Sequence, residues 1–378
     1  MATQKLLISF LLFSLLAGHK ADHGSSDHHQ QAQKAVHGSS DDHHQQHQHD
    51  AHSLDYPEGP LYPLKPTKLF VFGDSYADTG NLDKAEGRSW KVPYGKTFPG
   101  CPAGRFSDGL IFTDFLAKFF RVLSPLPSQW WPHAVGPHLR MGANFAYGGT
   151  GVFNTLTSDP NMTVQIDRFE SLVGDAIFKV ATTQTSVALF TNAGNDYYTY
   201  LSEKRDPNGL LGFMMDVVDQ LAKNMKRVHS LGVRRIAVTT LQPLGCLPQF
   251  TSANSFQKCN DTINTLVLIH NELLKEAVQK LNNETKSSTY IMIDLYNSFT
   301  YVIENTTTFK NPYKPCCMGV SSEYLCGNVD KNGTKKYTVC DDPCTHFFWD
   351  TVHPTQAGWG AVYWNLLPSL IHNFTSFP

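Results

Sequence analysis

Short apolar runs alternate with longer amphipathic runs from Thr67 to the end of the chain. The short runs predict β-strands at Leu69–Phe72, Val187–Thr191, Arg235–Thr240 and Tyr290–Ile293. The longest amphipathic runs predict helices at Leu210–Leu231 and Thr262–Leu281. Because strands and helices alternate, we expect an α/β fold in which a central parallel sheet carries helices on both faces.

Two segments with a different pattern precede this part of the chain. Residues 1–21 contain Lys5, an apolar run over residues 6–16 and then small residues, which is the layout of a cleaved signal peptide. The apolar run is too short for a membrane span, and no later segment is long and apolar enough to span a bilayer. Residues 22–66 form a His-rich repeat and a Pro-rich linker, which we expect to be disordered.

Length and charge add expectations about domains and partners. The length would allow two domains or more, but we expect a single α/β domain over residues 67–378, which is compatible with the usual size range. The formal charge of the chain is −2, and its charged residues are scattered, so neither nucleic acid nor an anionic membrane is an expected partner. The histidines of residues 22–66 leave transition-metal binding as an alternative role for that segment, beside a solvated or removed tail.

The stretch from Lys68 to Asn81 holds the first candidate for chemistry. An apolar run breaks at Gly-Asp-Ser, a pattern that predicts a strand ending in a presented serine, Ser75. A hydroxyl is a poor nucleophile at neutral pH, so Ser75 requires a base, an orienting carboxylate and an oxyanion hole from elsewhere in the chain.

The base and the carboxylate are found near the other end of the sequence. Asp350 and His353 are three residues apart, so one turn can place both side chains on the same side. A carboxylate that accepts the Nδ1 proton of His353 would fix the tautomer and leave Nε2 free to take the Ser75 proton.

Two segments between them can supply oxyanion donors. The Gly-rich run over residues 142–151 contains Gly149, whose backbone N–H is approachable because no Cβ blocks it. Asn195, in a second turn-like segment, offers a neutral side-chain amide. The backbone N–H of Ser75 itself would be the third donor.

Each motif alone is weak, but together and in this order they resemble the plant branch of the GDSL esterase/lipase family, the SGNH hydrolases, from about Thr67 to the C-terminus. The resemblance implies a flavodoxin-like three-layer α/β/α fold with no metal or organic cofactor. It also implies Ser75 as nucleophile, His353 as general base and acid, Asp350 as its orienter, and Gly149 with Asn195 as oxyanion donors. Tyr76 and Ala193 depart from the family pattern, and we expect them to alter the acyl pocket and the turn before Asn195.

The expected substrate is a small-molecule carboxylic ester that acylates Ser75. Water would then make the protein an esterase or lipase, whereas an acceptor hydroxyl would make it an acyltransferase. The segments at residues 89–94 and 160–163 resemble the branch with chlorogenate-dependent caffeoyltransferases, which implies transfer of a hydroxycinnamoyl group to a sugar acid or a second chlorogenate. Candidate stacking residues for a caffeoyl ring are Trp130, Trp131, Tyr197, Tyr198 and Tyr200. Aromatic residues at such spacing are more often packing residues, so they do not decide between transfer and hydrolysis. A non-enzymatic, metal-binding secreted protein remains the remote alternative.

Cysteines and glycan signals indicate the secretory pathway, ending in the extracellular space or the vacuole. The chain has eight Cys, five of them between Cys316 and Cys344, and we expect disulfides to brace the loop that carries Asp350 and His353. A zinc site is the rival interpretation. N-glycosylation sequons begin at Asn161, Asn260, Asn283, Asn305, Asn332 and Asn373.

Overall fold

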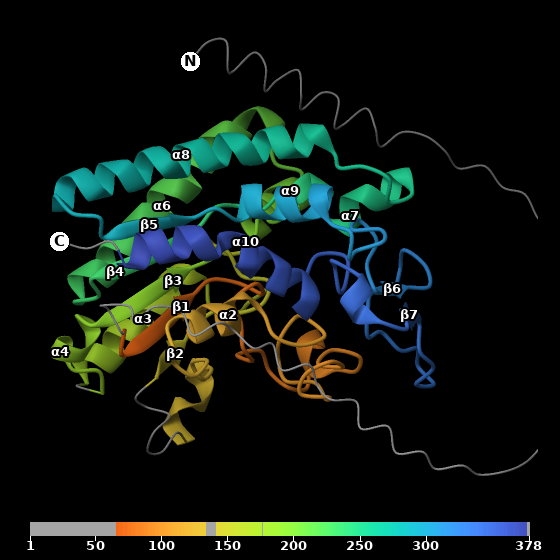
Figure 1. The fold of residues 1–378 in the computed structure, drawn as a ribbon, viewed down its shortest axis with the longest axis horizontal. Coiled ribbons are helices and arrows are strands. Elements are labelled where there is room, and N and C mark those ends of the chain that lie inside the picture. The colour runs from red at the N-terminus through yellow and green to blue at the C-terminus, as the bar shows by residue number, and fades with distance from the viewer. Residues whose placement is uncertain (1–65, 134–140, 176, 376–378) are drawn as a thin grey trace, which may run out of the picture.

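Five parallel strands form the central sheet of the protein (Figure 1). The computed structural model describes residues 66–133, 141–175 and 177–375. The strands are β1 (Lys68–Phe72), β2 (Gly142–Asn144), β3 (Ser186–Phe190), β4 (Arg235–Thr239) and β5 (Tyr290–Ile293). They lie in the order β2-β1-β3-β4-β5, and all four pairings are parallel. The predicted signal peptide and residues 22–65 lie outside the described residues.

The four predicted strands are present, with ends that differ by at most one residue, but β2 is missing from the prediction. We interpreted residues 142–144 only as part of a Gly-rich segment that presents donors. Gly142 has a φ of +100°, and a Cβ there would lie 2.0 Å from the carbonyl oxygen of Leu69. The glycine therefore permits β2 to approach β1, although glycine usually argues against a strand.

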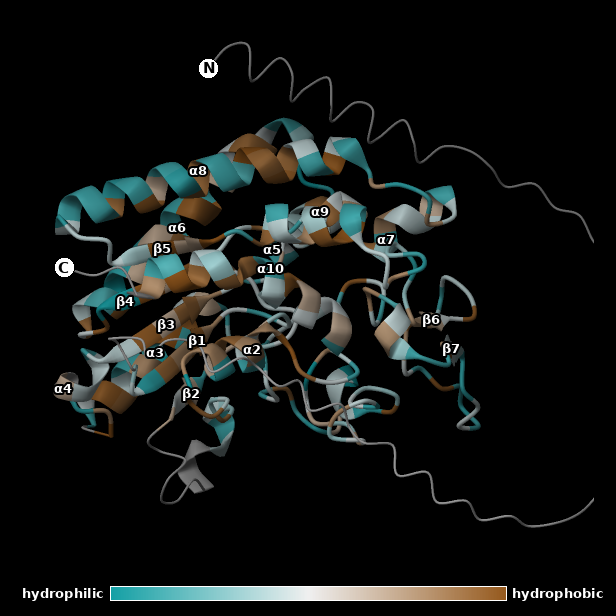
Figure 2. Ribbon diagram, viewed as in Figure 1, coloured by the Kyte–Doolittle hydropathy of each residue, from teal (hydrophilic) through white to brown (hydrophobic). Residues whose placement is uncertain are grey.

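Helices cover both faces of the sheet, as predicted. The helices α2 (Phe112–Phe119), α9 (Leu295–Asn305) and α10 (Gln356–Thr375) pack with one set of strand side chains. On the other face, α3 (Met162–Gly174), α6 (Leu210–Ser230) and α8 (Asp261–Thr285) pack with the alternate set. The strands are hydrophobic and α8 is largely hydrophilic on its visible side, in keeping with a buried sheet between helical layers (Figure 2).

Shorter elements connect these layers. The short helices are α4 (Val180–Thr183), α5 (Asn195–Ser202) and α7 (Pro248–Thr251). Single 3₁₀ turns are η1 (Arg88–Trp90), η2 (Ser128–His133), η4 (Pro207–Gly209), η5 (Leu244–Cys246), η6 (Ser252–Asn254) and η7 (Pro343–Thr345). A separate antiparallel hairpin consists of β6 (Cys317–Gly319) and β7 (Tyr337–Val339).

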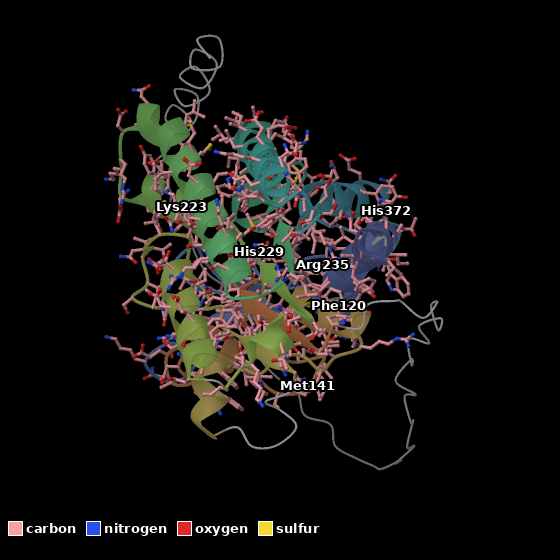
Figure 3. The ribbon with its side chains drawn as sticks, turned by 90° about the vertical axis from the view of Figure 1, so that its left-hand side faces the viewer. Phe120, Met141, Lys223, His229, Arg235 and His372 are labelled. Carbon is pink, nitrogen blue, oxygen red and sulfur yellow. A yellow bond between two sulfur atoms is a disulfide. The ribbon has the colours of Figure 1, made fainter. Side chains whose placement is uncertain are left out.

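The two ends of the sheet differ in what they carry. Figure 3 looks toward the end at which strands begin and several helices finish, where it labels Phe120, Met141, His229, Arg235 and His372. Ser75 and Asn195 instead follow the last residues of β1 and β3. Because ligands of open parallel sheets bind outside the carboxyl ends of the strands, this arrangement places the candidate site at the opposite end.

Candidate active site

Ser75 lies in the turn that follows β1. Gly73 opens this turn with a φ of +145°, and a Cβ at this position would lie 2.1 Å from the Thr191 Oγ1, so a larger residue does not fit. The Asp74 carboxylate accepts the backbone N–H of Ala193 and thereby ties the turn to the loop after β3. The Ser75 side chain sits in this frame with only 7% of its surface exposed.

Ser75, His353 and Asp350 form one hydrogen-bonded array. The Nε2 atom of His353 lies 2.7 Å from the Ser75 Oγ. The Nδ1 atom of His353 lies 2.9 Å from both carboxylate oxygens of Asp350. A neutral imidazole that donates from Nδ1 accepts at Nε2, so this arrangement can remove the proton of the Ser75 hydroxyl.

Several groups hold the Asp350 carboxylate in its charged form. The backbone N–H groups of Val352 and His353 each donate to Oδ1 at 2.8 Å, and the Tyr94 hydroxyl donates to Oδ2 at 2.7 Å. Burial by itself would raise the pKa of Asp350, but the adjacent His353 ring and the nearby Arg88 charge outweigh it and hold this pKa well below its usual range. Asp350 is therefore an anion that orients the ring.

Tyr94 is a site residue that the sequence did not predict. Its side chain is 1% exposed, and burial together with the Asp350 charge raises its pKa well above the usual value, so the hydroxyl stays protonated and donates. In the sequence it appeared only within a family-branch segment. No local pattern indicates a contact between residues 256 positions apart.

Two aromatic rings fix the position of the His353 imidazole. Phe106 stacks on this ring with a centroid distance of 4.8 Å, and Tyr76 packs beside it at 5.8 Å. Tyr76 is 2% exposed, and its hydroxyl donates to the carbonyl oxygen of Val352 at 2.8 Å. Tyr76 therefore lies in the core against the segment that carries Asp350 and His353, and the expectation that it alters the acyl pocket stays a prediction.

The predicted oxyanion donors lie on two loops that meet beside Ser75. Gly149 has a φ of +81°, a conformation that favours glycine. Asn195 begins α5, and its Nδ2 donates to the carbonyl oxygen of Thr150 at 2.9 Å. The amide has a second N–H that this bond leaves available. Ala193 does not adopt a positive φ, so the turn before Asn195 does not require glycine there.

Disulfides brace the segment that leads to Asp350. Cys316 pairs with Cys340, and Cys317 pairs with Cys326. The backbone N–H groups of Cys316 and Cys317 donate to the carbonyl oxygens of residues 348 and 349, immediately before Asp350. This agrees with the predicted bracing. A third bond joins Cys246 and Cys259, while Cys101 and Cys344 are exposed free thiols.

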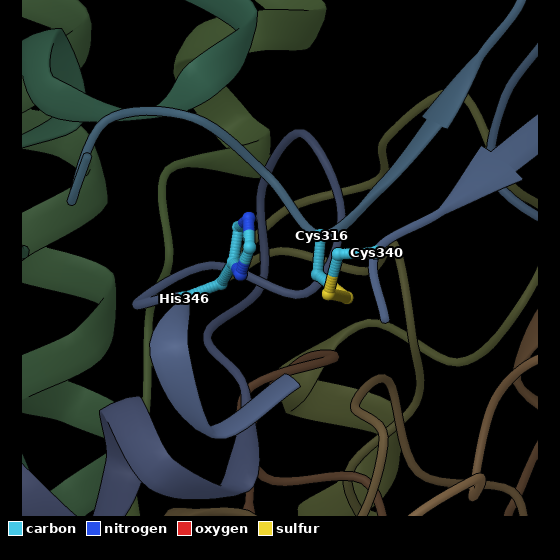
Figure 4. A group of neighbouring side chains, drawn as sticks. All are labelled: Cys316, Cys340 and His346. Atoms are coloured by element: carbon cyan, nitrogen blue, oxygen red, sulfur yellow. A yellow bond between two sulfur atoms is a disulfide. The ribbon is translucent and has the colours of Figure 1, made fainter. Parts of the chain in front are cut away.

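The same cysteines include the only group of candidate metal ligands found within the described residues. Cys316, Cys340 and His346 present ligand atoms within 4.8 Å of one another (Figure 4). Both sulfur atoms belong to one disulfide, and the metal-binding form of cysteine is the thiolate. The structure therefore favours the disulfide over the zinc interpretation for this pair.

The predicted stacking aromatics fall into two groups. Tyr197 and Tyr200 are each 7% exposed and belong to the core, which fits the packing alternative for these residues. Tyr198 is 57% exposed on α5, and Trp130 is 37% exposed and stacks on Trp90 at a centroid distance of 6.1 Å. The side chain of Trp131 lies outside the description.

Comparison with known proteins identifies the family of the chain. The family model described as GDSL-like Lipase/Acylhydrolase matches residues 69–363. The chain belongs to this family. Two GDSL esterase/lipase proteins of Arabidopsis thaliana are 57% and 51% identical over 318 residues, which cover 82% of this chain and 88% and 90% of the relatives. The solved structure of an α/β hydrolase from a lake metagenome covers 83% of this chain and 98% of its own, with 13% identity and a TM-score of 0.37.

As a GDSL esterase/lipase, the protein is an enzyme that acts on small-molecule carboxylic esters by hydrolysis or acyl transfer. Its sheet and helical layers are consistent with the predicted SGNH fold. Across residues 66–133, 141–175 and 177–375, no helix has both the length and the apolar character required to cross a membrane.

Proposed function

We propose that this GDSL enzyme cleaves its ester through an acyl-Ser75 intermediate. The observation that carries the proposal is the 2.7 Å contact between the Ser75 Oγ and the His353 Nε2. As Oγ bonds to the ester carbonyl carbon, its proton passes to Nε2. When the carbon–oxygen bond to the alcohol breaks, His353 returns that proton to the leaving alkoxide. Asp350 orients the ring and stabilises the imidazolium between these steps.

The negative oxygen that forms during attack requires donors. We assign this role to the backbone N–H groups of Ser75 and Gly149 and to the Asn195 side-chain amide. Asn195 is held by its bond to the Thr150 carbonyl, which supports a pre-organised donor. The mechanism requires neither a metal nor an organic cofactor.

We further propose that the acyl group is hydroxycinnamoyl, donated by chlorogenate and passed to a sugar acid or to a second chlorogenate. The motif resemblance at residues 89–94 and 160–163 supports this choice. The alternative is plain hydrolysis of a carboxylic ester, because the same acyl-Ser75 can be attacked by water.

Product analysis separates these outcomes. Purified protein incubated with chlorogenate and glucarate is expected to form caffeoyl-glucarate, and chlorogenate alone is expected to give dicaffeoylquinate. Neither product should form with Ser75→Ala. Free caffeate without any transfer product contradicts the transferase assignment and supports an esterase. Inactivity on chlorogenate together with hydrolysis of an aryl ester points to a different acyl group.

A cation near the site also supports an acidic substrate. Arg88 is partly buried in η1, close enough to lower the pKa of Asp350 by charge attraction. Within the described part of the chain, its guanidinium forms no ion pair with a carboxylate. Chlorogenate and sugar acids both carry a carboxylate, and guanidinium groups bind carboxylates well.

Replacing Arg88 therefore provides a second prediction. Arg88→Gln is expected to raise the KM for chlorogenate roughly tenfold, the effect of losing one ion pair of about 1.4 kcal/mol. The KM for chlorogenate methyl ester, which lacks the charge, should change by less than about twofold. Arg205→Gln is the matched control, because Arg205 is exposed and pairs with Glu203. An equal rise in KM for both substrates would contradict the proposed contact between Arg88 and the substrate carboxylate.

The proposed route is the secretory pathway, ending outside the cell or in the vacuole. Three disulfides support an oxidising compartment. The sequon residues Asn283, Asn305 and Asn332 are exposed and accessible to a glycan.

A further inference from the structure

Two buried carboxylates accept hydrogen bonds from the backbone of the loop Gly148–Phe153, and the proposed mechanism does not use either of them. We term this segment the oxyanion loop because it carries Gly149. We propose that Asp78 and Asp196 are positioning residues that clamp the two ends of this loop and so place the oxyanion donors. The inference rests on the proposed roles of Gly149 and Asn195.

Asp78 holds the first end of the oxyanion loop. Its Oδ2 accepts the backbone N–H of Gly148 at 2.9 Å. Its Oδ1 accepts the N–H groups of Gly80 and Asn81, each at 2.7 Å. Asp78 lies three residues after Ser75 and is fully buried, so one side chain links the nucleophile turn to the residue that precedes Gly149.

Asp196 holds the other end. Its Oδ1 and Oδ2 accept the N–H groups of Phe153 and Val152 at 2.9 and 3.0 Å. A Cβ at Gly151 would lie 2.6 Å from the carboxylate atoms of Asp196, so the loop backbone rests directly on this group. Asp196 is also the chain neighbour of Asn195, and this places the clamp and the proposed donor in the same turn of α5.

The middle of the oxyanion loop is fixed between these ends. The Asn195 Nδ2 donates to the Thr150 carbonyl at 2.9 Å, and the Thr150 Oγ1 lies 2.8 Å from the carbonyl oxygen of Tyr147 and 3.1 Å from that of Gly73. Any shift of the loop therefore moves Gly149 and changes the direction of the Asn195 amide together.

The burial of the two carboxylates is otherwise difficult to explain. Burial raises the pKa of Asp78 to about 7 and that of Asp196 to about 6, which means that folding disfavours their charged forms. Arg105 is the cation near Asp78, but it makes its bidentate bond to Asp114. The charged neighbour of Asp196 is Asp74, which repels it. Charge-assisted bonds to the loop N–H groups offset this burial, so the carboxylates and the loop geometry depend on each other.

Isosteric variants test the clamp. In Asp78→Asn the amide oxygen can still accept the N–H groups of Gly80 and Asn81. The NH₂ group of the new side chain then faces the N–H of Gly148, and two donors cannot bond to each other. Asp78→Asn and Asp196→Asn are each expected to lower kcat for an aryl ester about 10- to 100-fold, with less than a threefold change in KM, because the donors act on the transition state. Asp330→Asn is the control, since Asp330 accepts two backbone N–H groups at 2.9 Å in an exposed turn far along the chain.

Gly151→Ala provides an independent test that keeps both charges. Its added methyl group would displace the oxyanion loop from Asp196 and should lower kcat to a similar degree. Each variant is assayed well below its measured Tm, so that loss of folded protein does not contribute. Unchanged kcat in Asp78→Asn, Asp196→Asn and Gly151→Ala overturns the clamp.

A double-mutant cycle separates the clamp from the proposed oxyanion role. Asn195→Ala alone should lower kcat about 10²- to 10³-fold. If Asp196 acts through this donor, adding Asp196→Asn to Asn195→Ala costs less than about threefold more. Full multiplication of the two losses overturns a clamp in which Asp196 acts through Asn195. If Asn195→Ala leaves kcat unchanged, the proposed oxyanion role fails. If Asn195→Ala lowers kcat while Asp78→Asn and Asp196→Asn keep full activity, the oxyanion role stands and only the clamp fails.

Discussion

Replacing Asp350 with Asn is expected to lower kcat on an aryl ester roughly 10⁴-fold, the size of effect that a wrong histidine tautomer produces. In the wild type both Asp350 oxygens lie 2.9 Å from the His353 Nδ1. An amide can present its NH₂ to Nδ1 and so favour a proton on Nε2. His353 would then have no lone pair on Nε2 with which to accept the Ser75 proton. Steady-state kinetics measure the loss, and a thermal melt verifies that the variant is folded.

Labelling with a serine-reactive phosphonate extends this test to the whole triad. The wild type should label at Ser75, whereas Ser75→Ala and His353→Ala should not label. His346→Ala is the matched control, because its ring lies in the same segment but contacts Thr345 rather than Ser75. Full activity of Asp350→Asn would contradict the assigned triad. Metal binding without labelling of the wild type would favour the non-enzymatic alternative.

Most of the sheet could be predicted because its strands are buried on both faces and appear as uninterrupted apolar runs. Residues 69–72 and 290–293 illustrate this pattern. β2 could not be found in the same way, because its three residues include Gly142 and Asn144, which disfavour strands. Its pairing with β1 depends on a close backbone approach that only the folded chain shows.

The candidate site could also be predicted only in part from the sequence. Five candidate site residues could be predicted because they occur in recognisable local motifs: Ser75, Gly149, Asn195, Asp350 and His353. Tyr94, Phe106 and the loop-binding functions of Asp78 and Asp196 have no such signal, because each depends on contacts between segments distant in sequence. The core position of Tyr76 could not be predicted either, because its contact with the carbonyl oxygen of Val352 joins segments far apart in the sequence.

Helix α5 connects the site to a second buried group. Tyr197, two residues after Asn195, places its hydroxyl 2.6 Å from the Nδ1 of His270 on α8. His270 is 1% exposed, and its Nε2 has no hydrogen-bond partner within the described structure. Burial lowers the pKa of His270 to about 3, because a charged imidazole would lose its hydration there.

The lowered pKa predicts that His270 makes the fold less stable as the pH falls, whereas the raised pKa values of Asp78 and Asp196 act in the opposite direction over the same range. In the unfolded chain His270 binds a proton near its ordinary pKa of 6.5, whereas the folded protein does not bind one until about pH 3. Below pH 6.5 the unfolded state therefore holds more protons, and the free energy of unfolding falls by about 1.4 kcal/mol per pH unit from this group. Between pH 6.5 and pH 4 the expected loss is roughly 3 kcal/mol.

Urea denaturation of wild type and His270→Asn between pH 7.5 and pH 4 measures this loss. Asn does not titrate, and its Oδ1 can accept the Tyr197 hydroxyl, so the variant should be less stable at pH 7.5 from lost packing yet lose less stability on acidification. His372 is exposed, so His372→Asn is the control, and its free energy of unfolding should change with pH as steeply as that of the wild type. If the His270→Asn slope matches that of the wild type, another group governs the acid response. If it is flatter, protonation of the buried His270 contributes to the acid response of the wild type.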